Sequence, residues 1–155
     1  MANERPSWDT YFLNITRQVA TRSTCLRRQV GAILVRNRRI LATGYNGAPR
    51  GLAHCAEVGC LREQQNVPSG ERHELCRGLH AEMNTFLQAA SFGVSTEDST
   101  LYATAYPCSL CAKMAINAGV VRIVTLGDYP DPLAKKILAE ARIEVDVVTG
   151  GEDSG

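Results

Sequence analysis

Two short segments decide how this chain is interpreted: His80-Ala81-Glu82 and, 28 residues after His80, Pro107-Cys108-Ser109-Leu110-Cys111. Cys108 and Cys111 are three residues apart, so on a helix they lie on one face and can reach the same ion. Two thiolates and one neutral imidazole fill three positions of tetrahedral Zn²⁺, and an open fourth position for water is typical of a catalytic zinc. We therefore predict that His80, Cys108 and Cys111 bind a catalytic zinc ion.

Glu82 lies two positions after His80, a step that turns about 200° around a helix axis. In the first turn of a helix, however, both side chains can project past its end, so Glu82 can face the water at the metal. A lone C-x-x-C is often a zinc knuckle or a pair of buried thiols, and a lone H-x-E occurs by chance. Together, with Pro107 before the first cysteine, they match the established H-x-E…P-C-x-x-C signature of zinc-dependent deaminases.

The residues around these motifs follow the periods of helices and strands. Between residues 8 and 19 apolar side chains recur every three or four positions, which predicts an amphipathic helix over residues 7–24. Farther along, β-type runs alternate with helical patterns, which indicates a mostly parallel sheet with helices on its faces. The expected strands cover residues 29–35, 39–45, 100–104, 121–126 and 143–148, and the other expected helices cover 79–93, 108–118 and 132–141.

Composition limits the classes of protein to which the chain can belong. Its 155 residues are 45% hydrophobic, as in one globular domain, and its net charge of +1 gives no reason to expect a polynucleotide or an anionic membrane as partner. No apolar stretch approaches about 20 residues, and no secretory leader is recognisable, so we expect the protein in the cytoplasm, that of a host cell if it is viral. The Gly-rich residues 150–155 predict a flexible tail.

Four segments of the chain resemble the cytidine deaminase superfamily, and most closely the deoxycytidylate (dCMP) deaminases of bacteria and phages. They cover residues 25–32, 43–51, 80–84 and 106–113, and the second contains Gly44-Tyr45-Asn46-Gly47-Ala48-Pro49-Arg50-Gly51, which separates this branch from tRNA adenosine deaminases and free-cytidine deaminases. The resemblance implies a three-layer α/β/α fold with a mixed five-stranded sheet over residues 1–149. It also implies hydrolysis of dCMP to dUMP and ammonia, which supplies dUMP for thymidylate synthesis.

The resemblance further implies roles for individual residues. Glu82 would carry protons between water, the pyrimidine and the departing ammonia. The backbone N–H of Ala81 would hold the pyrimidine carbonyl, Asn46 would contact the sugar or the base, and Tyr106 would wall the pocket. Each of the last two also has a structural interpretation, because Asn46 suits a turn and Tyr106 suits a packed core.

A second, structural zinc is predicted for the segment 47–78, which has no sustained periodicity and needs ties to be ordered. Five soft ligands remain for it: Cys25, Cys55, Cys60, His73 and Cys76. The resemblance points to Cys25 and Cys55, and the spacing of His73 and Cys76 allows both to reach one metal. Cys60 is the alternate ligand, and His54 is the third choice.

Members of this family are typically homo-hexamers activated by dCTP, with which Mg²⁺ can bind, and inhibited by dTTP. Arg22, Arg27, Arg28 and Arg50 could serve a triphosphate or be solvated surface, so no effector residue is assigned. Two alternatives to dCMP deamination stay open. One is a deaminase of a free nucleoside, of guanine or of tRNA adenosine; the other is a zinc-organised binding module without catalysis, against which Glu82 argues.

Overall fold

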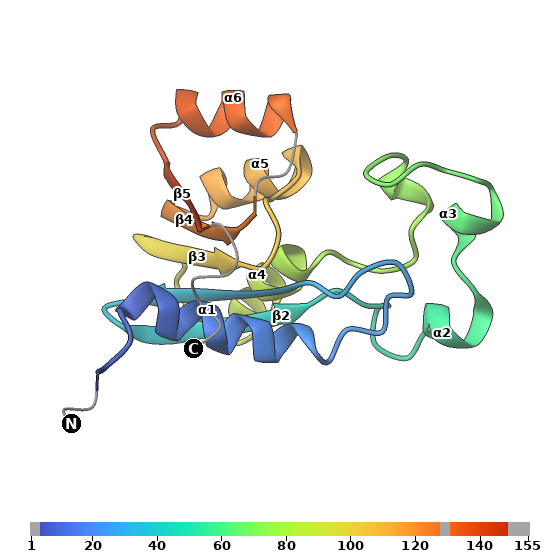
Figure 1. The fold of residues 1–155 in the computed structure, drawn as a ribbon, viewed down its shortest axis with the longest axis horizontal. Helices are drawn as coiled ribbons and strands as arrows, with labels where there is room; N and C mark the ends of the chain where they lie inside the picture. Colours follow the sequence, from blue (N-terminus) through green and yellow to red (C-terminus); the bar gives the residue numbers. More distant parts are fainter. Residues whose placement is uncertain (1–3, 128–130, 149–155) are drawn as a thin grey trace.

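The computed structural model describes residues 4–127 and 131–148 and has a five-stranded sheet at its centre (Figure 1). The strand order is β2-β1-β3-β4-β5. β1 is antiparallel to both β2 and β3, whereas β3, β4 and β5 run parallel, so the mixed sheet is confirmed and the sheet is less parallel than the strand and helix alternation suggested. The strands are β1 (Gly31–Arg36), β2 (Arg39–Tyr45), β3 (Ser99–Ala103), β4 (Val120–Leu126) and β5 (Glu144–Val148).

Helices cover both faces of the sheet, which confirms the three-layer α/β/α fold (Figure 1). One face carries α1 (Trp8–Ala20), whose Phe12 packs in a buried cluster with Ile33 of β1. The next residue of β1, Leu34, points to the other face and joins the larger core cluster. That face is covered by α4 (Ala81–Ser91), α5 (Ser109–Asn117) and α6 (Pro132–Glu140).

The first helix is shorter than predicted and ends at Ala20 instead of residue 24. Ser7 caps its beginning, because the Ser7 hydroxyl oxygen accepts a hydrogen bond from the Thr10 backbone N–H at 3.1 Å. Past Ala20, hydroxyl side chains compete with helical hydrogen bonding: the Thr21 hydroxyl donates to the Gln18 carbonyl oxygen at 2.6 Å. Residues 21–30 therefore form an irregular connection to β1.

Glycines in β1 and β2 let the helices approach the sheet closely. A Cβ atom on Gly31 would lie 2.5 Å from the Thr16 carbonyl oxygen of α1. A Cβ atom on Gly44 would lie 2.5 Å from both the Ala81 carbonyl oxygen and the Thr85 backbone nitrogen of α4. Gly44 therefore sets how closely the N-terminal turn of α4 approaches the sheet.

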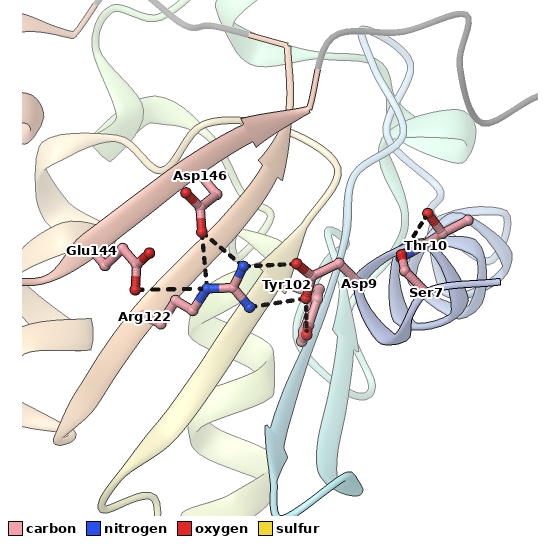
Figure 2. Close-up of polar contacts among 7 residues, drawn as sticks. All are labelled: Ser7, Asp9, Thr10, Tyr102, Arg122, Glu144 and Asp146. Carbon is pink, nitrogen blue, oxygen red and sulfur yellow. Dashed lines mark hydrogen bonds and ion pairs between the residues drawn. The ribbon is translucent and has the colours of Figure 1, made fainter.

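A network of charged side chains ties α1 to the parallel strands (Figure 2). The Arg122 guanidinium donates to both Asp9 carboxylate oxygens at 2.9 and 2.7 Å and to Asp146 at 2.9 and 2.7 Å. The Tyr102 hydroxyl also donates to Asp9, at 2.7 Å. The hydrogen bonds from Arg122 hold the pKa of Asp9 below its usual value, so the carboxylate is charged in the folded protein.

The segment 47–78 contains three short helical turns that the sequence pattern did not predict: α2 (Cys55–Val58), α3 (Leu61–Gln64) and the 3₁₀ turn η1 (His73–Leu75). Its two ends meet where Gly47 and Leu79 pair as an isolated antiparallel bridge. The expected flexible tail, residues 150–155, lies outside the described residues. Within residues 4–127 and 131–148, no helix combines the length and the apolar character required to cross a membrane.

Candidate active site

His80, Cys108 and Cys111 converge at the N-terminal ends of α4 and α5. The His80 Nδ1 atom lies 3.5 Å from the Cys108 Sγ atom and 3.4 Å from the Cys111 Sγ atom. Zinc bonds of about 2.0 Å to nitrogen and about 2.3 Å to sulfur, at a tetrahedral angle, require a separation of roughly 3.5 Å between the two ligand atoms. The distances from His80 to both cysteines therefore fit a tetrahedral zinc ion.

Local structure explains why these side chains point to one place. His80 and Cys108 are the N-cap residues of α4 and α5, and Cys111 lies one turn into α5. Asp131, which sequence analysis did not single out, holds the beginning of α5: its carboxylate accepts from the Ser109 N–H at 2.9 Å and from the Ala134 N–H of α6 at 3.0 Å. The only sequence signal for Asp131 is an N-cap residue before Pro132.

The two cysteines differ in their tendency to ionise. A hydrogen bond from the Cys111 thiol, together with one from the His80 ring, lowers the pKa of Cys108 well below that of a free thiol. The same hydrogen bond and burial raise the pKa of Cys111. The hydrogen bond with Cys108 raises the pKa of His80. These contacts favour the thiolate form of Cys108 over that of Cys111.

Glu82 lies in the first turn of α4 and is 4% exposed. Burial raises the pKa of its carboxyl, because a charged carboxylate is poorly solvated there. Glu82 and His80 line the same cavity, of about 120 Å³, as the first-turn geometry requires. A single water needs only about 10–15 Å³, so this cavity has room for a molecule larger than water.

All three predicted substrate residues, Asn46, Ala81 and Tyr106, line this cavity. The Asn46 side chain is also structural, since its amide group donates to the Arg28 carbonyl oxygen at 2.9 Å and its Oδ1 atom accepts from the Val30 N–H at 2.8 Å. Tyr106 is 7% exposed and belongs to the main core cluster. Both residues thus line the cavity. Tyr106 packs in the core as the sequence allowed, whereas Asn46 is not a turn residue and instead holds the backbone of Arg28 and Val30.

The five remaining soft ligands divide between two places. The ligand atoms of His73, His80 and Cys108 all lie within 4.8 Å of one another, and the His73 and His80 ring centroids are 4.7 Å apart. Burial raises the pKa of Cys55, and the nearby thiols of Cys76, Cys60 and Cys25 raise it further. The structure therefore puts His73 beside the predicted catalytic ligands, which sequence spacing does not reveal. Among the described residues, no three of Cys25, Cys55, Cys60 and Cys76 have ligand atoms grouped within 4.8 Å of one another.

The comparisons with known proteins agree with this geometry. A family model described as the cytidine and deoxycytidylate deaminase zinc-binding region matches residues 6–127. ComE operon protein 2 of Bacillus subtilis (strain 168) is 40% identical over 146 residues, which are 94% of this chain and 73% of that protein. The deoxycytidylate deaminase of Schizosaccharomyces pombe is 41% identical over 125 residues, which are 81% of this chain but only 38% of that protein.

Among solved structures, the dCMP deaminase of cyanophage S-TIM5 in complex with dCMP and dUMP superposes with a TM-score of 0.78. It is 28% identical, and the match covers 94% of this chain and 100% of that one. The fold, the zinc-compatible His/Cys cluster and the match to the family over residues 6–127 agree with one another. This chain belongs to the cytidine and deoxycytidylate deaminase family, whose zinc-binding region it contains.

Proposed function

We propose that this protein hydrolyses dCMP to dUMP and ammonia, which supplies dUMP for thymidylate synthesis. The observation that carries the proposal is the meeting of His80, Cys108, Cys111 and the buried Glu82 at one cavity. The substrate is inferred from two relatives: the fission yeast protein is named a deoxycytidylate deaminase, and the cyanophage structure contains dCMP and dUMP.

His80, Cys108 and Cys111 would hold the catalytic zinc. When bound, zinc supplies Lewis acidity that lets water act as a nucleophile near neutral pH. The side chains around it do the remaining work. The N-terminal ends of α4 and α5 direct their partial positive charge at the cysteine thiolates and at Glu82, which stabilises these negative groups.

Glu82 is the proposed proton carrier. It takes one proton from the attacking water and delivers it to ring nitrogen N3, then takes the proton of the new C4 hydroxyl and delivers it to the amino group, which leaves as ammonia. Burial suits this role, because a raised pKa helps the carboxyl to hold the proton between the two transfers. Ala81 would hold the pyrimidine carbonyl through its backbone N–H, with Asn46 and Tyr106 placing the sugar and the base.

A second zinc is proposed for the insertion, bound by Cys25, Cys55 and Cys76. His73 and Cys60 compete for the fourth position. The thiol of Cys60 is one of the neighbours that raise the pKa of Cys55, whereas His73 lies against His80, so the placement favours Cys60. A four-thiolate set is common in structural zinc sites.

Activation by dCTP, with or without Mg²⁺, inhibition by dTTP and assembly into a hexamer stay predictions from the family resemblance. So does a location in the cytoplasm. Initial rates at low dCMP with each triphosphate, with and without Mg²⁺, test the regulation, and sedimentation of the same samples tests the hexamer.

A panel of substrates tests the proposed function. We expect ammonia release from dCMP to exceed release from cytidine, CMP, dCTP, adenosine, guanine and a tRNA substrate. Faster ammonia release from another compound of the panel would mean that this compound, and not dCMP, is the substrate of the deamination. If the zinc-loaded protein released ammonia from none of them, the alternative of a zinc-organised binding module without catalysis would be favoured.

A further inference from the structure

Arg62 of α3 is a buried cation without a counter-charge. It is 8% exposed, and no carboxylate of the described residues lies within 4.0 Å of its guanidinium. Its one hydrogen bond is long, 3.4 Å from the Nη2 atom to the Pro68 carbonyl oxygen. The Nε atom is fully buried and has no hydrogen-bond partner. Burying an unpaired charge is unfavourable, so an anion that enters the cavity and accepts a hydrogen bond from Arg62 would be bound favourably.

The place of Arg62 shows where that anion would lie. Arg62 lines the cavity that holds His80 and Glu82. Arg62 therefore shares one cavity with the predicted reaction centre.

Another arginine of the insertion, Arg77, has a partner of its own. Its Nη1 atom donates a hydrogen bond to the Ala53 carbonyl oxygen at 2.7 Å. Among the described residues of the insertion, Arg62 is the arginine with a buried nitrogen that has no partner.

A second orphaned guanidinium nitrogen lies on the wall of the same cavity. The Nη1 atom of Arg27, in the irregular connection after α1, is buried and has no hydrogen-bond partner. Three arginines line the cavity, Arg27, Arg28 and Arg62, against one carboxylate, Glu82. A phosphate group would supply acceptors to the buried guanidinium nitrogens of Arg62 and Arg27 that have no partner among the described residues, whereas the base and sugar of a neutral nucleoside carry no such charge.

We propose that Arg62, assisted by Arg27, forms the subsite for the 5′-phosphate of a nucleoside monophosphate. The planar fork of a guanidinium donates two parallel hydrogen bonds to phosphate oxygens, which a hydroxyl of a free nucleoside cannot replace. This inference rests on the proposed function, since it assigns the phosphate of the substrate bound at that site. It makes the insertion part of substrate recognition.

Binding of the product and of its phosphate-free counterpart tests the subsite without relying on turnover. Calorimetry on the zinc-loaded protein compares dUMP with deoxyuridine for the wild type, Arg62→Gln and Arg62→Lys. We expect Arg62→Gln to weaken dUMP binding roughly 100-fold and deoxyuridine binding less than about threefold. Arg62→Lys keeps the charge but loses the fork, so we expect its dUMP affinity to lie between those of the wild type and Arg62→Gln.

The matched control is Arg72→Gln, which removes an exposed arginine of the same insertion that pairs with Glu74. It should leave both affinities unchanged. Equal weakening of dUMP and deoxyuridine by both Arg62 variants, or a wild type that binds the two alike, would overturn the phosphate subsite. Failure of the wild type to release ammonia from dCMP while still preferring dUMP would instead overturn the proposed function and leave the subsite standing.

Discussion

Gly47 and Leu79 exchange two backbone hydrogen bonds, from the Gly47 N–H to the Leu79 carbonyl oxygen at 3.2 Å and from the Leu79 N–H to the Gly47 carbonyl oxygen at 2.8 Å. The pair closes the insertion directly before His80, the N-cap of α4. The order of the insertion and the position of the first proposed zinc ligand are therefore coupled through the backbone.

That coupling leads to a prediction for Cys25→Ser. If Cys25 binds a second zinc together with Cys55 and Cys76, the free energy of metal binding is also the free energy that orders the insertion. We expect zinc to fall from two ions per chain to one, the melting temperature to drop, and proteases to cut residues 47–78 faster. Unchanged metal content and unchanged proteolysis would mean that Cys25 is a buried thiol only.

The close approach at Gly44 predicts a different defect. In Gly44→Ala the new Cβ atom pushes against the Ala81 carbonyl and the Thr85 backbone, so α4 moves away from β2. We expect a loss of about 1–3 kcal/mol in the free energy of unfolding and weaker binding of the catalytic zinc, measured by denaturation and by chelator competition.

Gly51→Ala is the control for Gly44→Ala. A Cβ atom on Gly51 meets nothing within 4 Å, although its φ of +82° disfavours alanine. It should lower stability without changing zinc affinity. Equal zinc affinity in the two variants and in the wild type would show that the position of α4 does not depend on Gly44.

The Arg122 network predicts a pH-dependent stability. Because the folded-state pKa of Asp9 is below its ordinary value near 3.8, its contribution is fully present above that value and is lost as the pH falls through the folded-state pKa. Asp9→Asn should lower the free energy of unfolding at pH 7 by about 1–2 kcal/mol, a range that allows for solvent screening of a side chain that is 36% exposed. The difference from wild type should shrink below pH 4.

Glu144→Gln provides the comparison for Asp9→Asn. Glu144 is 68% exposed and lies 3.9 Å from Arg122, so its removal should change stability by less than about 0.5 kcal/mol. Urea denaturation between pH 3 and pH 7 measures both variants. A constant difference between Asp9→Asn and wild type over this range would contradict the assignment to the Asp9 carboxylate.

Glu82→Gln separates proton transfer from metal binding. The change removes the carboxyl but none of the three proposed zinc ligands. We expect zinc content near that of the wild type and a rate of dCMP turnover lower by roughly 10²–10⁴-fold, measured by elemental analysis and ammonia release. Loss of zinc together with activity would make Glu82 a ligand or a structural residue instead.

The sequence could predict the helices and strands that have a hydrophobic period, but not the elements that are too short to have one. The strands and the long helices repeat apolar residues at regular intervals, so their order along the chain could be predicted. Periodicity alone suggests a mostly parallel sheet, and the mixed sheet is expected only from the family resemblance. The turns α2, α3 and η1 are three or four residues long and have no period to detect. The helix predicted over residues 7–24 is too long for another reason. Hydroxyl groups after Ala20 compete with the helix for backbone hydrogen bonds, and hydrophobic periodicity does not detect this competition.

The residues of the cavity likewise differ in whether the sequence could predict them. His80, Cys108 and Cys111 could be found because their spacing on two helix ends is specific to one chemistry. His73 and Arg62 lie in the insertion, whose path depends on tertiary contacts. Sequence gives no sign that Arg62 is buried, since arginine is mostly exposed in proteins, and nothing marks His73 as a neighbour of His80.

The source of the new oxygen in the product tests the central claim most directly. Wild-type, zinc-loaded protein is incubated with dCMP in H₂¹⁸O, and the nucleotide and ammonia are measured by mass spectrometry and by an ammonia assay. Hydrolytic deamination predicts dUMP carrying one ¹⁸O at C4 and one ammonia per dUMP. Unchanged dCMP, or ammonia without labelled dUMP, would contradict it.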